Sequence, residues 1–373
     1  LEKLEKLEKL EKLEKLEKLE KLEKLEELEE LEELEKLNKF KKMGEKIIVS
    51  GRHIEGLYPH VDVWGFGISL YLFIGGLAAG ILLFATYFFI KGKEKEMPVA
   101  VKISTIIPPI IIAIGLFFLV EDLHHKAYFW KLMIHFKIES PMSWGAWVLT
   151  VVFILSIFWP LSFLEDIKKF FEENNKKRLY KWTEKFSKFV NKVTLVPKLI
   201  ELTTKYRKQV AYTIFFLSII LGIYTGILLS SFNARPLWNT PILGVLFLVS
   251  GVSTGAAAIM WMSNNKEEKK LFSKIDLGLI MIELLLIGLM FLGMVWGPEV
   301  QQTSAEMFFG GQFTAIFWGA FVTLGLVIPA LLEAFELKGF HVPIAVPAFL
   351  ILMGGLLFRA IMVTAGQIST YTF

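Results

Sequence analysis

Acidic, imidazole and indole side chains gather in a short polar stretch, residues 121–147, that separates two long apolar segments. The stretch reads EDLHHKAYFWKLMIHFKIESPMSWGAW, and it opens with four titratable side chains: Glu121, Asp122, His124 and His125. Carboxyl and imidazole groups exchange protons near neutral pH, and beside hydrocarbon they are costly unless paired or hydrated. The cluster therefore predicts a proton-exchanging site at a membrane surface. The alternative is that these residues only anchor helix ends at that surface.

The elements that position this cluster are apolar helices. The chain of 373 residues is 54% hydrophobic and has a mean hydropathy of +0.52, which indicates a polytopic membrane protein. We predict an all-α integral membrane fold with eight spanning helices. Their expected ranges are 64–90, 101–120, 143–164, 209–232, 240–263, 273–297, 311–335 and 343–366.

The domain organisation follows from composition and from a faint internal repeat. Residues 1–43 are a low-complexity Leu/Glu/Lys stretch, which predicts a long charged helix without a fixed apolar stripe. The motif IGGLAAG at 74–80 matches VSGVSTG at 249–255 in size, which favours a parallel duplication. We therefore expect a first four-helix bundle over 44–232, with a basic loop at 165–208, and a second bundle over 233–373.

Lys and Arg alternate between the connections. The odd-numbered loops hold 20 of these residues, 13 of them within 165–208, and the even-numbered loops hold 4. By the positive-inside rule, both termini and the polar cluster lie outside, while the basic loop lies on the cytoplasmic surface. Because the basic excess lies mostly in loops, it gives no reason to expect nucleic acid as a partner.

Small residues and prolines predict the local packing. Four glycine pairs spaced by four residues predict close helix contacts, and they are Gly76 with Gly80, Gly222 with Gly226, Gly251 with Gly255, and Gly293 with Gly297. Pro108 and Pro109 lie inside the second apolar segment, where two missing amide donors predict a kink.

Several cofactor classes are disfavoured by residue counts. The chain has no cysteine, so an iron–sulfur cluster held by thiolates must belong to a partner. Its six histidines are placed before the first apolar segment or in loops, which argues against haem held between helices. Adjacent His124 and His125 with a distant His135 make a poor zinc site, so we expect no metal.

The external ends of the first four segments predict a quinone site. A quinone needs an apolar slot for its ring and tail, hydrogen-bond partners for its carbonyls, and a nearby proton acceptor. We expect Tyr224 or His60 to bind a carbonyl, with Trp144 beside it, and Glu121 or Asp122 to accept a proton. Arg235 and Trp238 lie in the fourth loop, where we expect contact with a partner subunit.

Three ionisable residues lie deeper in the apolar segments. Glu283 is in the middle of the sixth segment, Glu333 is near the cytoplasmic end of the seventh, and Arg359 is within the eighth. Buried charges persist in membranes when they are paired or hydrated. A proton path through the second bundle and a structural ion pair explain them equally well.

Four motifs occur in a distinctive order. They are YLFIGGLAAG at 71–80, SPMSWGAW at 140–147 after FWKLMIHF, YTGILLSSFNARPLWNTP at 224–241, and LLFRAIMVTAGQ at 356–367. In this order they resemble the NrfD family, the membrane subunits of polysulfide-reductase-type complexes. The resemblance covers about residues 60–367. It implies a haem-free subunit of two four-helix bundles in a prokaryotic cell membrane.

The resemblance also implies function and partners. It implies a menaquinone or ubiquinone site near the outer face, at His60, Glu121, Asp122 and Tyr224. It further implies an external ferredoxin-like iron–sulfur subunit and a catalytic molybdopterin or cytochrome subunit. Family members commonly have Asp-Leu-Gly-Arg-Pro where this chain has DLHHK at 122–126, so the acid is kept and the tight turn is lost. The alternatives are a non-catalytic membrane anchor for redox subunits and a secondary transporter.

Overall fold

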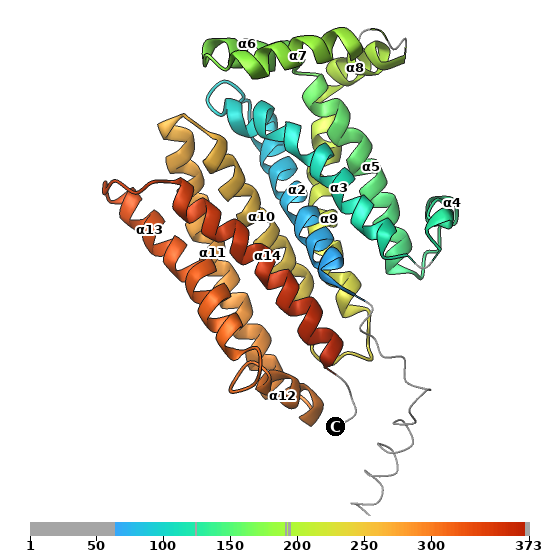
Figure 1. Ribbon diagram of the computed structural model, residues 1–373, viewed down its shortest axis with the longest axis vertical. Coiled ribbons are helices and arrows are strands. Elements are labelled where there is room, and N and C mark those ends of the chain that lie inside the picture. Colours follow the sequence, from blue (N-terminus) through green and yellow to red (C-terminus); the bar gives the residue numbers. More distant parts are fainter. Residues whose placement is uncertain (1–63, 124, 191, 193–194, 370–373) are drawn as a thin grey trace, which may run out of the picture. The chain divides into compact units, whose positions relative to one another are not determined.

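The computed structural model describes residues 64–369 except 124, 191 and 193–194, and these residues form helices without a strand (Figure 1). The proposed helix over 1–43 and the site residue His60 lie outside this range. Eight helices are long and apolar enough to cross a membrane, as predicted. They are α2 (Phe66–Ile90), the helix 99–121 that ends in α3 (Ile107–Glu121), α5 (Pro141–Leu161), α9 (Arg207–Ser230), α10 (Ile242–Met262), α11 (Lys266–Val295), the helix 315–337 that ends in α13 (Ile328–Leu337), and α14 (Ala345–Ile368).

Shorter helices join these spans. They are η3 (Lys126–Tyr128) and α4 (Lys131–Ile134) before α5, then α6 (Leu164–Glu173), α7 (Lys177–Val190) and α8 (Leu195–Lys205) before α9, and α12 (Glu299–Glu306) after α11. Figure 1 shows α6, α7 and α8 lying across the end of α5 and α9. We call the end formed by residues 91–98, 162–190, 195–206, 263–265 and 338–344 the Lys-rich end. The opposite end carries Trp64 and residues 125–140, and we call it the Trp64 end.

Helices α2 and α10 form the centre, since each packs against the other and against α9 and α14. The two matching glycine motifs meet at this contact. A methyl group on Gly255 would lie 2.6 Å from the carbonyl carbon of Gly80, and one on Gly251 would lie 2.9 Å from the carbonyl oxygen of Gly76. Only glycine allows two backbones to approach this closely.

The other two glycine pairs differ from each other. Gly226 faces the backbone of Gly244 on α10, so the prediction for this pair is confirmed. In contrast, Gly293 has nothing within 4 Å of an added methyl group, and Gly297 is crowded by Gln301 and by its own chain. The predicted helix contact at Gly293 and Gly297 is therefore wrong, because Gly293 lies on an open face of α11 and Gly297 lies beyond the end of this helix.

The helix type changes just before the proline pair, where the sequence predicts a kink. Residues 99–103 form a π-helical turn, η1, residues 104–106 form a 3₁₀ turn, η2, and the α-helix begins only at Ile107. Pro108 and Pro109 then occupy the first turn of α3, where missing amide donors are tolerated.

Helix α11 begins earlier than the sequence suggested. Asn265 caps it by accepting a hydrogen bond from the amide of Glu267 at 3.0 Å, so residues 266–272 are helical and not part of a loop. Within this turn, the fully buried Glu268 accepts hydrogen bonds from the amide of Ala100 at 2.8 Å and from the Ser263 hydroxyl at 2.6 Å. The carboxylate thereby joins α10 and α11 to the start of helix 99–121.

Candidate functional site

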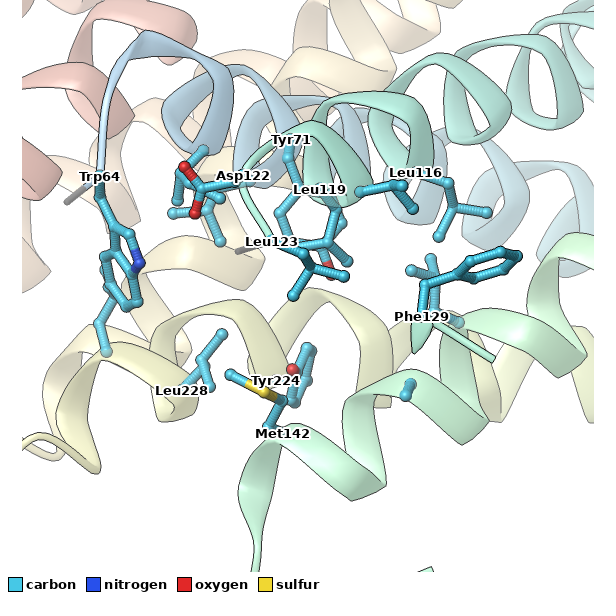
Figure 2. Close-up of a pocket in the computed structure, with 16 residues that line it drawn as sticks. Trp64, Tyr71, Leu116, Leu119, Asp122, Leu123, Phe129, Met142, Tyr224 and Leu228 are labelled. Carbon is cyan, nitrogen blue, oxygen red and sulfur yellow. The ribbon is translucent and has the colours of Figure 1, made fainter. Parts of the chain in front are cut away.

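A cavity of about 320 Å³ lies among α2, α3, α5 and α9 at the Trp64 end (Figure 2). Its walls are mostly aliphatic and aromatic. Three polar side chains reach it from three elements, namely Tyr71 from α2, Asp122 from the end of α3, and Tyr224 from α9. An apolar slot with a few convergent polar groups is the usual form of a small-molecule site.

The two tyrosines approach the cavity from opposite walls, as Figure 2 shows. Tyr71 is 6% exposed and Tyr224 is 8% exposed. Neither phenolic hydroxyl makes a hydrogen bond within the described part of the chain. A buried phenol normally has a partner. The two hydroxyl groups are therefore available to a polar molecule in the cavity.

Gly145 of α5 creates the space for one of these rings. A methyl group at this position would overlap the phenol ring and the hydroxyl of Tyr224. The glycine within the motif SPMSWGAW thus positions a side chain from a different motif, 224–241. The geometry explains why both motifs belong to one site.

The rim of the cavity is fixed by a third motif. The Trp64 backbone exchanges two hydrogen bonds with the side chain of Gln367 in α14, each 2.9 Å long. The Trp64 ring stacks on Trp238, with ring centroids 5.5 Å apart, and the Trp238 indole donates to the carbonyl of Met362 at 2.7 Å. Arg235 donates to the carbonyl of Gln367. Residues 224–241 and 356–367 together hold Trp64 in place.

Two of the predicted site residues, Asp122 and Tyr224, line this cavity. Asp122 ends α3, and Figure 2 shows its carboxyl group at the rim on the side of Trp64. The neighbouring Glu121 does not line the cavity. Its exposed carboxylate pairs with Lys126 at 2.6 Å.

Other predicted residues are placed differently. Trp144 is 47% exposed, and its indole donates to the carbonyl of Ile138 at 2.8 Å, so it does not reach the cavity. His125 is exposed beside the ring of Tyr128. His124 and His60 lie outside the described residues. Within that described part, no three His, Cys, Asp or Glu side chains gather as a metal site requires.

Arg235 and Trp238, the residues proposed for the partner contact, lie at the rim of the cavity. Trp238 is only 2% exposed, so its indole offers no surface to another subunit. Arg235 is half-buried and bonds to the carbonyls of Gln367 and Ser369. Both side chains thus hold the rim of the cavity from within. Both residues lie at one end of the bundle, as expected for residues of a loop, but a loop position does not show which way a side chain points.

The deep charges lie in a second region, among α10, α11, α13 and α14. Arg359, Glu283 and Glu333 are each at most 1% exposed. The Arg359 guanidinium donates to the hydroxyl of Ser250 at 2.6 Å, and Ser250 lies beside Glu283. A hydroxyl group therefore lies between the cation and the acid, where the sequence suggested a direct ion pair as one alternative.

Asp276 belongs to the same region, and sequence reasoning missed it. It is fully buried two helical turns before Glu283, and it lies beside Glu333 and Ser253. Glu336 continues towards the Lys-rich end and accepts from Ser273 at 3.4 Å. The acids lead from the Lys-rich end of the bundle towards Arg359.

Comparisons with known proteins agree with one another. The family model described as "Polysulphide reductase, NrfD" matches residues 54–370. Protein NrfD of Escherichia coli is 29% identical over 331 residues, covering 86% of this chain and 98% of that protein. One polypeptide of the polysulfide reductase of Wolinella succinogenes is 28% identical over 82% of this chain and 94% of its own length. One polypeptide of the selenate reductase of Mesobacillus selenatarsenatis is 23% identical over 83% of this chain and 75% of its own length.

Proposed function

The chain belongs to the polysulphide reductase NrfD family, and from this premise we propose that it exchanges electrons between a membrane quinone and an external iron–sulfur subunit. Its relatives include subunits of polysulfide and selenate reductases. The observation that carries the proposal is the cavity with Tyr71, Asp122 and Tyr224 at the Trp64 end.

The residues present fit a quinone. The slot is apolar, as a ring and an isoprenoid tail require, and two buried hydroxyl groups face it without a partner in the described chain. When bound, a quinone supplies a carrier of two electrons and two protons that is soluble in the bilayer. Tyr71 and Tyr224 would donate hydrogen bonds to a carbonyl oxygen, and Asp122 would hold the transferred proton at its carboxyl group. Menaquinone and ubiquinone both suit these contacts.

The partners follow from what the chain lacks and from its charge distribution. The chain has no cysteine, so a thiolate-bound iron–sulfur cluster would belong to a partner, for which a ferredoxin-like subunit is proposed. The Lys and Arg bias of the loops supports an outward-facing Trp64 end in a prokaryotic inner membrane, with both termini on that side. The iron–sulfur subunit would dock there and connect to a catalytic molybdopterin or cytochrome subunit.

Replacing Asp122 by Asn in the assembled complex tests the proposal. We expect quinol-dependent turnover to fall by about 100-fold, a typical contribution of a positioned acid or base, while activity with an artificial dye persists. Glu121→Gln is the matched control. It removes an adjacent carboxylate that is exposed and paired with Lys126, so turnover should change by no more than about twofold.

Equal losses of quinol-dependent and dye-dependent activity in Asp122→Asn would contradict the proposal, and so would an equal effect of Glu121→Gln. Binding of a quinone analogue to the purified complex gives a second test. A membrane anchor without a quinone site would show no saturable quenching of its tryptophan fluorescence by the analogue. In a quinone-reactive subunit, Asp122→Asn or Tyr224→Phe should weaken that quenching.

The buried acids support a second, related proposal, which is proton movement through the other half of the protein. No backbone amide among the described residues bonds the carboxyl groups of Asp276 or Glu333, although both are fully buried. Two adjacent buried carboxylates repel, and a proton held between them removes that repulsion. We propose that Glu336, Glu333, Asp276 and Glu283 pass protons between the Lys-rich end and Arg359.

A further inference from the structure

A second cavity, of about 350 Å³, lies at the Lys-rich end. Helices α3, α5, α6 and α7 line it. Pro109 of α3 and Pro160 of α5 form part of its wall. Pro160 lies inside α5, where a proline ring clashes with the preceding turn and bends the helix, whereas Pro109 lies in the first turn of α3. The quinone site proposed above does not require this cavity.

The lining of this cavity offers almost no hydrogen-bond partner to the part of a ligand that lies inside it. Eleven of the twelve lining residues are apolar, and the exception is Thr183. Its hydroxyl is already used, since it donates to the carbonyl of Leu179 at 2.6 Å and lies 3.0 Å from the carbonyl of Tyr180. A hydrocarbon chain fits such a wall, whereas a quinone ring would leave its carbonyl groups without a partner.

The cavity opens towards the lipid-facing surface of the helices. Ile110 on its rim is 54% exposed, and Trp182 on the opposite rim is 55% exposed. Ile110 continues along α3 into the exposed residues Ile114 and Phe117, which form an apolar surface suited to lipid. A molecule can therefore enter this cavity sideways from the bilayer.

Helix α7 adds an apolar stripe at this opening. Leu179, Trp182, Phe186 and Phe189 have the spacing of a single helix face. The rings of Trp182 and Phe186 stack with centroids 5.3 Å apart, and both line the cavity. Because Leu179, Trp182 and Phe189 are exposed, this face is suited to the boundary between head groups and acyl chains.

A row of cations runs beside the apolar stripe. Arg178, Lys181 and Lys185 are three and four residues apart, so they lie along one line on α7, and all three are exposed. Within the described part of the chain, none of them forms an ion pair. Lys188 is different, because it pairs with Glu184 at 2.8 Å.

The layer that carries these groups is fixed to the bundle. Lys102 of the helix 99–121 pairs with Asp166 of α6 at 2.8 Å. Ile167 and Phe171 of α6 are buried, and the guanidinium of Arg207 lies 4.1 Å from the centre of the Phe163 ring. Helix α6 is therefore held against the bundle, and α7, which carries the cations, packs on α6 and buries Thr183 and Val190.

We propose that this cavity binds an anionic phospholipid, with one acyl chain between Pro109, Pro160 and Trp182 and the phosphate group beside Arg178, Lys181 and Lys185. The apolar wall selects the chain, and the row of cations selects the charge of the head group. The proposal assigns a ligand to the long basic segment 165–208, and it stands whether or not the other cavity binds a quinone.

Native mass spectrometry of the purified full chain tests this proposal, with dioleoyl phosphatidylglycerol and dioleoyl phosphatidylcholine as the probes. The two lipids share their acyl chains and differ in charge. We expect one tightly retained phosphatidylglycerol. Removal of a single cation should weaken retention by about fivefold in each of the variants Arg178→Gln, Lys181→Gln and Lys185→Gln. Lys188→Gln should change retention less. Ile157→Trp, which fills the cavity, should abolish retention of the lipid with the row of cations intact.

Three results would overturn the proposal. The first is equal retention of the two lipids by the unaltered chain. The second is unchanged retention of phosphatidylglycerol in a variant that combines Arg178→Gln, Lys181→Gln and Lys185→Gln. The third is displacement of the lipid by inorganic phosphate or by a short-chain quinone, since the acyl chain would then not be the anchored part. Circular dichroism of each variant shows that the helices are retained.

Discussion

Two cavities of similar size border both α3 and α5, at opposite ends of these helices, and they differ in what lines them. The cavity at the Trp64 end measures about 320 Å³ and receives Tyr71, Asp122 and Tyr224. The cavity at the Lys-rich end measures about 350 Å³, and its single hydroxyl group is bound to its own helix. The volumes of the two cavities do not distinguish them, whereas their polar lining groups do.

The origin of each cavity explains the difference. At the Trp64 end, separate motifs bring a glycine, two phenols and a carboxyl group together, and Gln367 fixes the rim through Trp64. At the Lys-rich end, Pro109 and Pro160 line the cavity together with apolar side chains of α6 and α7. The first arrangement offers hydroxyl and carboxyl groups to a polar ring, and the second offers an almost wholly apolar wall.

Filling each cavity in turn tests this contrast and should give the largest effect. We expect Leu228→Trp, at the Trp64 end, to lower quinol-dependent turnover by about 100-fold because the added ring occupies the slot. Ile157→Trp, at the Lys-rich end, should leave that turnover nearly unchanged. Steady-state assays of both complexes with quinol and with an artificial dye give the measurement. If Ile157→Trp abolished quinol oxidation, the two cavities would not have separate roles.

Gly145→Ala should give the next largest effect. The new methyl group overlaps the Tyr224 phenol, so the ring must move out of position. Misplacement of a contact group by about 1 Å can cost up to about 100-fold, and we expect a loss of about tenfold or more in quinol-dependent turnover. Gly293→Ala is the matched control, since its methyl group would meet nothing within 4 Å. Equal activities of the two variants would show that the position of Tyr224 does not matter.

The spanning helices could be predicted from sequence because membrane hydrocarbon demands long apolar runs, whatever the tertiary packing. The predicted start of the sixth span, at residue 273, was late. The charged turn of α11 that precedes it is helical, and its acid Glu268 is buried against Ala100. Hydropathy cannot detect a buried charge that bonds to a distant backbone amide.

The sequence proposes part of the candidate site. It points to Asp122 and Tyr224, which both line the cavity, but it does not allow a choice between Asp122 and Glu121. Adjacent residues on a helix point about 100° apart, and only the packing of α3 shows which of them faces the cavity. Tyr71 and Gly145 were missed for the same reason, since their roles depend on the approach of separate helices.

Removing one phenolic hydroxyl should have a moderate effect. Tyr71→Phe and Tyr224→Phe each delete one hydrogen-bond donor and keep the ring, so we expect a loss of about fivefold in kcat/KM for quinol. Tyr87→Phe, on the same helix as Tyr71 but 42% exposed, is the control. Kinetics with a series of quinols provides the measurement. If Tyr71→Phe and Tyr224→Phe both kept the wild-type kcat/KM, the two hydroxyl groups would not contribute to the difference between the cavities.

Glu283→Gln should have the smallest effect on turnover and separates the two explanations of the buried charges. If the acids carry protons, proteoliposomes with this variant should move fewer protons per quinol oxidised, while turnover with an uncoupler changes by only about twofold. If Glu283 instead balances the charge of Arg359 through Ser250, its loss leaves a buried cation without compensation, and thermal stability should fall with no change in proton stoichiometry. Glu267→Gln, an exposed acid at the start of the same helix, should change neither quantity. The outcome also decides whether the half of the protein formed by α10, α11, α13 and α14 has chemistry of its own or only supports the cavity at the Trp64 end.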